Sequence, residues 1–156
     1  MSDLRQTYRD YIVDIGLMQL ATVDQETNRP WLCSVWYVMD DEDNVYWCSR
    51  KTRRHSQEIG DGGYATCTIT KNYNEGLGQK GRALILSGDA SLVPQDKIEF
   101  VYDLYAQKYN KTESMQSFET FLNGSGVHFF YQITPDQIVW WDELEPGDNP
   151  RKIIKG

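Results

Sequence analysis

The chain has 156 residues and a formal charge of −7, and 40% of its residues are hydrophobic, 25% charged and 13% aromatic. This composition predicts one folded domain over residues 1–156 and excludes a disordered chain, because enough apolar residues are present to form a core. The acidic balance argues against a nucleic-acid-binding or membrane-surface protein, since both functions need an extended basic face.

The first half of the chain predicts an N-terminal helix followed by strands with short connections. Apolar residues recur at helical spacing from Leu4 to Ile15, which predicts a helix within residues 1–16 that Ser2 caps and Gly16 ends. Runs rich in β-branched and aromatic residues, separated by polar turns, then predict strands. These strands are expected at residues 19–23, 31–39, 45–49 and 64–70.

Two of these segments carry further expectations. The strand at residues 31–39 is apolar on both faces, which is usual where both faces of a sheet are covered. The acidic stretch at residues 40–44 is interpreted as a hairpin turn whose carboxylates are exposed to solvent. A short helix is expected at residues 52–59, ending at Gly60.

The second half predicts a strand at residues 82–93, a helix at 96–109, a second helix at about 113–122, and closing strands at 127–134 and 138–142. Gly88 lies inside the first of these strands and indicates a β-bulge or a close approach of another backbone. A turn at residues 135–137 is expected to join the closing strands, because it begins with a proline. Residues 143–156 are read as a polar tail.

Six to seven strands with short connections predict a mainly β fold, an antiparallel barrel with peripheral helices. The barrel is expected over residues 17–142, after the helix at 1–16. A doubly wound parallel sheet is disfavoured, because each parallel crossover needs a dozen or more residues between strands.

A basic cluster, Lys51-Thr52-Arg53-Arg54-His55, follows the strand that carries Trp47. With Arg50, it holds four of the 16 lysines and arginines of this acidic chain. If Thr52 caps the helix, cations lie in its first turn, where the helix dipole disfavours them unless an anion is bound. The cluster therefore predicts a phosphate site, and the alternative is a solvated basic turn.

The cysteines and histidines carry little functional signal. Cys33, Cys48 and Cys67 form no C-x-x-C pair and are interpreted as reduced core residues. His55 and His128 lie far apart without cysteine or carboxylate ligands at metal spacing, so we expect no metal site. No apolar run approaches the roughly 20 residues that span a bilayer, and the first residues are polar, so we expect a cytoplasmic protein without membrane association.

Several short motifs occur in an order that is found in one known family. They are L-A-T-V-D at residues 20–24, the Pro-led strand at 30–37, Trp47-Cys48 followed by Thr52-Arg53-Arg54, L-S-G-D-A at 86–90 and Y-Q-I-T-P-D-Q-I at 131–138. In this order and spacing the chain resembles the pyridoxamine 5'-phosphate oxidase-like family of FMN-binding split barrels. It resembles small bacterial members more than the oxidase itself.

This resemblance implies a split β-barrel that forms a homodimer with FMN at the subunit interface. Ser34, Val35 and Trp36 would contact the isoalloxazine ring, and Trp47 and Cys48 would line the approach to the phosphate. Thr52, Arg53 and Arg54 would bind the phosphate, with Lys51 close by. Trp36 and Trp47 are the candidate aromatic walls, while Trp140 and Trp141 are expected in the core or, from the partner subunit, over the ring.

Two functions remain open. The first is an FMN-dependent oxidoreductase acting on a small molecule, in which the flavin does the chemistry and no catalytic residue can be named. Tyr37 is a weak candidate for a polar contact with the substrate, and His55 is expected beside the phosphate. The second is a non-enzymatic protein that holds FMN, the deazaflavin F420 or heme as a carrier or sensor.

Overall fold

The structure is a computed structural model and describes residues 4–109 and 115–156. Its strands are β1 (Leu17–Val23), β2 (Pro30–Met39), β3 (Val45–Arg50), β4 (Gly63–Thr70), β5 (Arg82–Leu92), β6 (His128–Asp142) and β7 (Arg151–Lys155). Its helices are α1 (Leu4–Ile12), α2 (Arg54–Ile59), α3 (Ile98–Tyr109) and α4 (Phe118–Asn123), with a 3-10 turn, η1 (Gln95–Lys97), before α3. The predicted cap Ser2 and the start of the helix expected at 113–122 lie outside the described residues.

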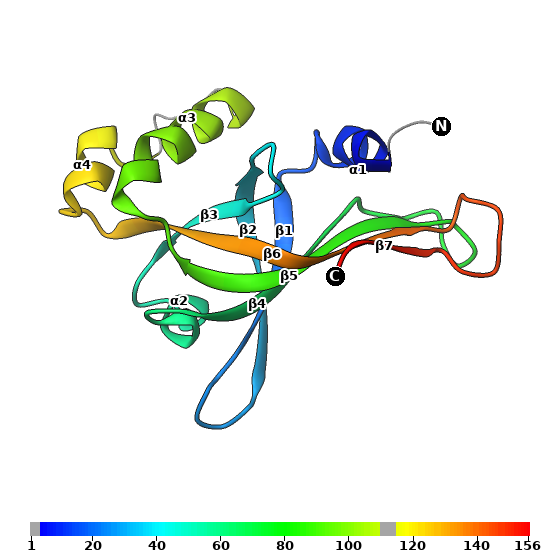
Figure 1. The fold of residues 1–156 in the computed structure, drawn as a ribbon, viewed down its shortest axis with the longest axis horizontal. Coiled ribbons are helices and arrows are strands. Elements are labelled where there is room, and N and C mark those ends of the chain that lie inside the picture. The colour runs from blue at the N-terminus through cyan, green and yellow to red at the C-terminus, as the bar shows by residue number, and fades with distance from the viewer. Residues whose placement is uncertain (1–3, 110–114) are drawn as a thin grey trace.

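Six strands close into an antiparallel barrel. The hydrogen-bonded order is β3-β2-β1-β4-β5-β6, and β3 pairs with β6 to complete the ring. β7 extends the sheet beyond β6, and the helices lie around the periphery of the barrel (Figure 1). The predicted fold class, mainly β with an antiparallel barrel and peripheral helices, is confirmed. The segment predicted as a polar tail contains β7, which pairs with the second half of β6.

The closing part of the barrel differs from the prediction of two strands and a proline turn. β6 is one strand of 15 residues, and Pro135 lies within it, opposite Gly88 of β5. The β5–β6 register shifts between Ser87 and Gly88, so the bulge expected at Gly88 is confirmed. Because the ladder is already irregular there, the missing N–H of proline does not interrupt the strand.

Two hydrophobic clusters hold the molecule together. The first fills the barrel and includes the fully buried Trp47 and Trp140, together with Tyr8 and Ile12 of α1. Trp140 is therefore a core residue, which was one of the two roles expected for it. The second cluster joins α3 and α4 to the outer faces of β2, β3 and β6. Since each cluster buries several aromatic side chains, both contribute strongly to stability.

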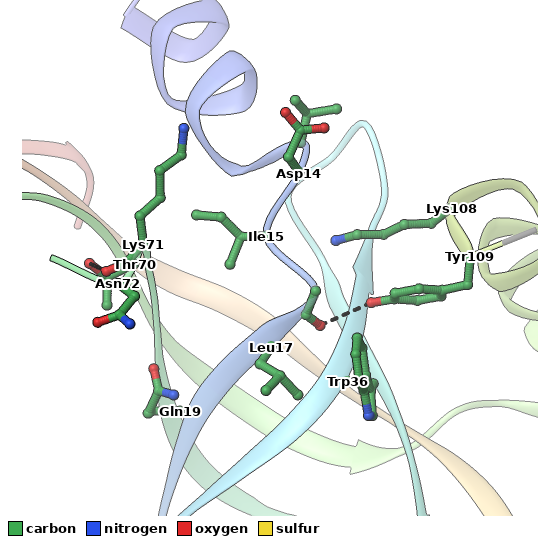
Figure 2. A pocket seen from close by; sticks show the side chains of 12 residues that line it. Asp14, Ile15, Leu17, Gln19, Trp36, Thr70, Lys71, Asn72, Lys108 and Tyr109 are labelled. Atoms are coloured by element: carbon green, nitrogen blue, oxygen red, sulfur yellow. Dashed lines mark hydrogen bonds between the residues drawn. The ribbon is translucent and has the colours of Figure 1, made fainter. Parts of the chain in front are cut away.

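Two tyrosines tie α3 to the barrel near the end of β2. The Tyr105 hydroxyl donates a hydrogen bond to the Trp36 carbonyl at 2.9 Å. The Tyr109 hydroxyl lies 3.0 Å from the Gly16 carbonyl oxygen (Figure 2) and also reaches the carbonyl of Tyr37. These contacts fix the C-terminal end of α3 beside the start of β1.

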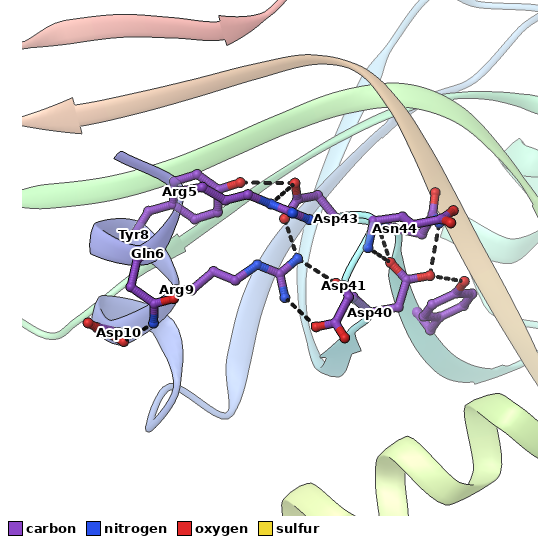
Figure 3. Close-up of polar contacts among 11 residues, drawn as sticks. Arg5, Gln6, Tyr8, Arg9, Asp10, Asp40, Asp41, Asp43 and Asn44 are labelled. Atoms are coloured by element: carbon purple, nitrogen blue, oxygen red, sulfur yellow. Dashed lines mark hydrogen bonds and ion pairs between the residues drawn. The ribbon is translucent and has the colours of Figure 1, made fainter. Parts of the chain in front are cut away.

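The acidic turn between β2 and β3 is exposed only in part. Asp41 and Glu42 are exposed as interpreted, whereas Asp40 and Asp43 are buried, so the interpretation was wrong for these two. Asp43 accepts hydrogen bonds from Arg5 and Tyr8 at 3.1 and 2.9 Å, and it also pairs with Arg9 (Figure 3). Asp40 accepts from Tyr46 at 2.8 Å. The Asp43 carboxylate can be buried because α1 brings two arginines to it, a contact between segments more than 30 residues apart.

From Pro30 to Trp36, β2 does not have both faces covered by this chain. Trp31, Leu32 and Trp36 are exposed, and the β1–β2 hairpin projects away from the barrel (Figure 1). The second half, at Tyr37 and Val38, is buried as expected. Among the residues that the structure describes, no helix is long and apolar enough to cross a membrane.

Candidate functional site

The basic cluster begins on a strand and ends in a helix that is shorter than predicted. β3 continues to Arg50, because Arg50 still pairs with His128 of β6. α2 starts at Arg54, with Arg53 at the N-cap position and no side-chain capping hydrogen bond. The expectation that Thr52 caps this helix was therefore wrong. A helix of six residues also has a weak dipole, so binding of an anion here depends on side chains.

The cluster divides between two sides of the chain. Arg50 and Arg53 line a hollow, whereas the Arg54 guanidinium pairs with Glu58 at 2.6 Å and lies 4.5 Å from the centre of the Trp31 ring. Lys51 lies over the Phe129 ring at 4.2 Å. The structure thus brings Arg53 together with Arg50 and separates it from Arg54, the partner that the sequence favoured.

The hollow beside Arg50 and Arg53, here named the arginine pocket, has a volume of about 750 Å³. Of the predicted site residues, those that line it are Ser34, Val35, Trp36, Cys48 and Arg53. The other lining residues are Ser49, Arg50, His55, Tyr105, Tyr109, Met115 and His128. Lys51, Thr52 and Arg54 are not among them. The volume is typical of a site for a small molecule or cofactor, roughly 300–1,000 Å³.

Two neutral histidines organise the polar end of the arginine pocket. His55 is buried, with Nε2 at 2.7 Å from Ser49 Oγ and Nδ1 at 3.3 Å from Cys33 Sγ. Burial, and secondarily the charge of Arg53, lowers its pKa. His128 is half-buried, and its Nε2 accepts a hydrogen bond from Arg50 Nε at 3.3 Å. Burial and the two arginines lower the pKa of His128 as well.

The arginines of this pocket have no acidic partner among residues 4–109 and 115–156. Arg53 makes no hydrogen bond or ion pair with another described side chain, and the described side-chain partner of Arg50 is the neutral His128. Both residues are exposed. In a chain with a net charge of −7, such uncompensated cations are suited to binding an anionic ligand.

Aromatic and thiol groups line the remainder of the pocket. The Trp36 side chain is 60% exposed, and Tyr109 meets it edge-on with ring centres 5.6 Å apart. Cys48 and Tyr109 are half-buried, and burial raises the pKa of each to about 12. Both groups therefore stay protonated at neutral pH, where they can donate hydrogen bonds but cannot act as bases.

Two residues predicted for the site have their side chains in the core instead. Trp47 is fully buried and stacks on Tyr131 with ring centres 5.6 Å apart, so its indole does not form a wall of the pocket. Tyr37 is also fully buried, and its hydroxyl donates to the carbonyl of Ile12 at 3.3 Å. The proposed substrate contact by Tyr37 was therefore wrong. Both side chains belong to the barrel core, which contains residues of β2 and β3.

Cys33, Cys48 and Cys67 are free thiols, and Cys67 is buried. In the described part of the chain, no three His, Cys, Asp or Glu side chains gather as a potential metal site.

No protein-family model matches the sequence, and none of the curated proteins matches it. Solved structures do match. A heme binding protein from Mycobacterium smegmatis has a TM-score of 0.75 at 13% identity, over 98% of this chain. HutZ, the heme storage protein from Vibrio cholerae, has 0.62 at 19%, over 86% of this chain and 91% of its own.

A putative 5-nitroimidazole antibiotic resistance protein from Bacteroides thetaiotaomicron has a TM-score of 0.68 at 11% identity, over 88% of this chain and 82% of its own. This chain spans 59% of the length of the mycobacterial protein. At these identities the likeness establishes a shared fold.

Proposed function

We propose that the arginine pocket binds FMN and that the protein is an FMN-dependent oxidoreductase acting on a small molecule. The observation that carries this proposal is the pair Arg50 and Arg53, two guanidinium groups without an acidic partner among the described residues, at a hollow of about 750 Å³. The exposed indole of Trp36 lines the same hollow. A phosphate needs charge-assisted donors and a flavin ring needs a flat wall, so both parts of FMN find suitable groups.

The residues present fit this cofactor in three ways. Arg50 and Arg53 would hold the phosphate, and the neutral His128 would orient Arg50 through their hydrogen bond. The backbone of β2 from Ser34 to Trp36 would lie along the ring. Bound flavin supplies hydride and electron transfer. The chain itself would bind, orient and donate hydrogen bonds, since its pocket thiol and phenols stay protonated.

The phosphate contact is tested by comparing FMN with riboflavin, which lacks the phosphate. We expect replacement of Arg50 and Arg53 together by Ala to weaken FMN roughly a hundredfold or more, because two charge-assisted contacts are lost. Riboflavin should change little. The matched control is Arg54→Ala, since Arg54 belongs to the same cluster but pairs with Glu58. Quenching of flavin fluorescence measures all affinities, and equal losses for FMN and riboflavin would contradict the assignment.

Heme is a second candidate, favoured by the fold that this chain shares with a heme binding protein and a heme storage protein. His128 is the residue that could hold the heme iron, because it is neutral and half-buried in the arginine pocket. Its Nε2 would have to give up the hydrogen bond that it accepts from Arg50 at 3.3 Å. If the protein carries heme, added hemin should give a Soret band that shifts in the His128→Ala variant. If the protein saturates with FMN and added hemin gives no Soret band, heme binding is refuted and the flavin assignment stands.

A further inference from the structure

A second hollow lies beside the arginine pocket, and the two share Trp36 and Tyr109 as lining residues. It has a volume of about 1,120 Å³ and lies between the α1–β1 connection, the end of β4 and the C-terminal end of α3 (Figure 2). We name it the lysine hollow. Its lining combines apolar side chains, amides, two cations and one carboxylate, among them Ile15, Leu17, Gln19, Lys71, Lys108 and Asp14.

Lys108 is a half-buried cation without a counter-ion among the described residues. Its Nζ lies 3.7 Å from the centre of the fully buried Tyr37 ring and 5.7 Å from that of Tyr109. It makes no ion pair or hydrogen bond with any side chain that the structure describes. Burial lowers its pKa to about 8. Lys71 lies on the opposite side of the hollow and is exposed (Figure 2).

Trp36 supplies a fixed aromatic surface in the same hollow. A Cβ atom at Gly16 would lie 2.5 Å from the indole, so the indole packs directly on the backbone at that position. Tyr109 meets its edge at an interplanar angle of 89°. Because these contacts hold the ring in place while much of it stays exposed, Trp36 can receive a planar ligand with little loss of side-chain entropy.

We propose that the lysine hollow binds a small aromatic carboxylate, whose ring packs on Trp36 and whose carboxylate pairs with Lys108. A single half-buried ammonium beside apolar residues suits a monoanion with an apolar body. A phosphate would need several convergent donors, which the arginine pocket has. Binding in the lysine hollow does not require a cofactor in the arginine pocket. The assignment of an aromatic carboxylate to the first and of FMN to the second can therefore fail independently.

The probes are 2-naphthoate and its uncharged counterpart 2-naphthamide, measured by equilibrium dialysis against the full chain. We expect naphthoate to bind and naphthamide to bind at least tenfold more weakly, since the charge-assisted contact is absent. Lys108→Met should reduce naphthoate affinity to that of naphthamide. The matched control, Arg53→Met, removes a cation from the neighbouring pocket and should leave naphthoate binding unchanged.

The pH dependence gives a second readout on the unaltered chain. As the pH rises from 7 to 9.5, Lys108 loses its proton, so naphthoate affinity should fall through about pH 8. The groups that face Lys108 are Arg9, Asp10 and Asp14 from α1 and the connection after it, Tyr37 from β2, Tyr109 from α3 and Lys71 from the end of β4. Burial raises the pKa of both tyrosines, so they stay neutral over this range.

Lys108→Arg keeps a permanent charge and serves as a second variant if Lys108→Met does not fold. It should retain naphthoate binding and remove the pH dependence, because arginine stays protonated. Three results would overturn the proposal: equal affinity for naphthoate and naphthamide, a flat pH profile in the unaltered chain, or loss of binding in Arg53→Met with Lys108→Met unaffected. The last result would place the ligand in the arginine pocket.

Discussion

At the scale of single residues, Gly88 is the position where the barrel allows least change. A Cβ atom there would lie 2.1 Å from the Thr134 carbonyl oxygen and 2.6 Å from the Cα of Pro135. Both contacts are with backbone, so no side-chain rotation can relieve them. The close approach of the β6 backbone therefore requires glycine at position 88. β6 continues as one strand past this bulge and pairs with β3 before it and with β7 after it.

We expect Gly88→Ala to lower the free energy of unfolding by about 2–3 kcal/mol, because β5 and β6 must separate at the bulge to make room for the methyl group. Urea-induced unfolding followed by tryptophan fluorescence measures the change. Asp89→Ala is the control, since this neighbouring side chain is exposed and its removal should change stability by less than about 0.5 kcal/mol. A Gly88→Ala variant as stable as the control would mean that the backbones can move apart freely.

The sequence predicted the bulge correctly, because a glycine inside a strand has few other physical explanations. The prediction of which arginines share the site failed, because it depended on the residue at which β3 ends. Since β3 extends one residue beyond its predicted end, Arg50 faces the arginine pocket, while Arg54 falls on the first turn of α2 and meets Glu58. Nothing local to the cluster determines which arginine faces the pocket.

At the scale of elements, α1 depends on Asp43 for its position. The carboxylate receives Arg5, Tyr8 and Arg9 from three positions on the helix, and Asp43 itself has a left-handed backbone, with φ at 68°. By holding α1 against the β2–β3 turn, this contact also fixes the connection that forms one side of the lysine hollow. The sequence could not show this, because the acids and the arginines are distant along the chain.

Asp43→Ala should lower the free energy of unfolding by about 3 kcal/mol, because it removes a buried carboxylate that accepts from Arg5, Tyr8 and Arg9 together. Asp43→Asn should cost less, since asparagine tolerates the left-handed backbone and can still accept a hydrogen bond. Asp41→Ala is the control from the same turn, because this side chain is exposed and pairs with Arg9 only at 3.4 Å. Urea unfolding separates the three, and equal losses for Asp41→Ala and Asp43→Ala would contradict the role of Asp43.

Helices and strands with a regular sequence pattern could be predicted. Those that form only by pairing with strands distant in the sequence could not. The helix at 96–109 and the first five strands follow from periodicity and turn residues, because these signals are local. β7 and the continuity of β6 depend on pairing with strands elsewhere in the barrel. The tyrosines of the site, Tyr105 and Tyr109, reach β2 from α3, and only the docked position of that helix brings them there.

At the scale of the whole molecule, the barrel leaves apolar side chains of β2 exposed. Leu32 is 62% exposed and Trp36 60% exposed, next to the partly covered Trp31. A strand with apolar residues on both faces is usual where both faces are covered, and this chain fully buries only Tyr37 and Val38 of β2. We propose that a second copy of the chain covers Trp31 and Leu32 at the start of β2, which would leave Trp36 open and place the partner beside the arginine pocket.

If this proposal is right, the sedimenting species should have twice the 18.1 kDa mass of one chain. Leu32→Glu should convert it to the monomer, since a buried carboxylate at the contact would be left without a partner. The control is Leu77→Glu, because Leu77 is fully exposed in the β4–β5 loop, far along the chain from β2, and should leave the dimer intact. Sedimentation velocity at micromolar concentration distinguishes these outcomes. A monomeric unaltered chain would refute the dimer. If both Leu32→Glu and Leu77→Glu dissociate the dimer, the contact does not lie at Leu32 in particular, or added negative charge dissociates the dimer in general.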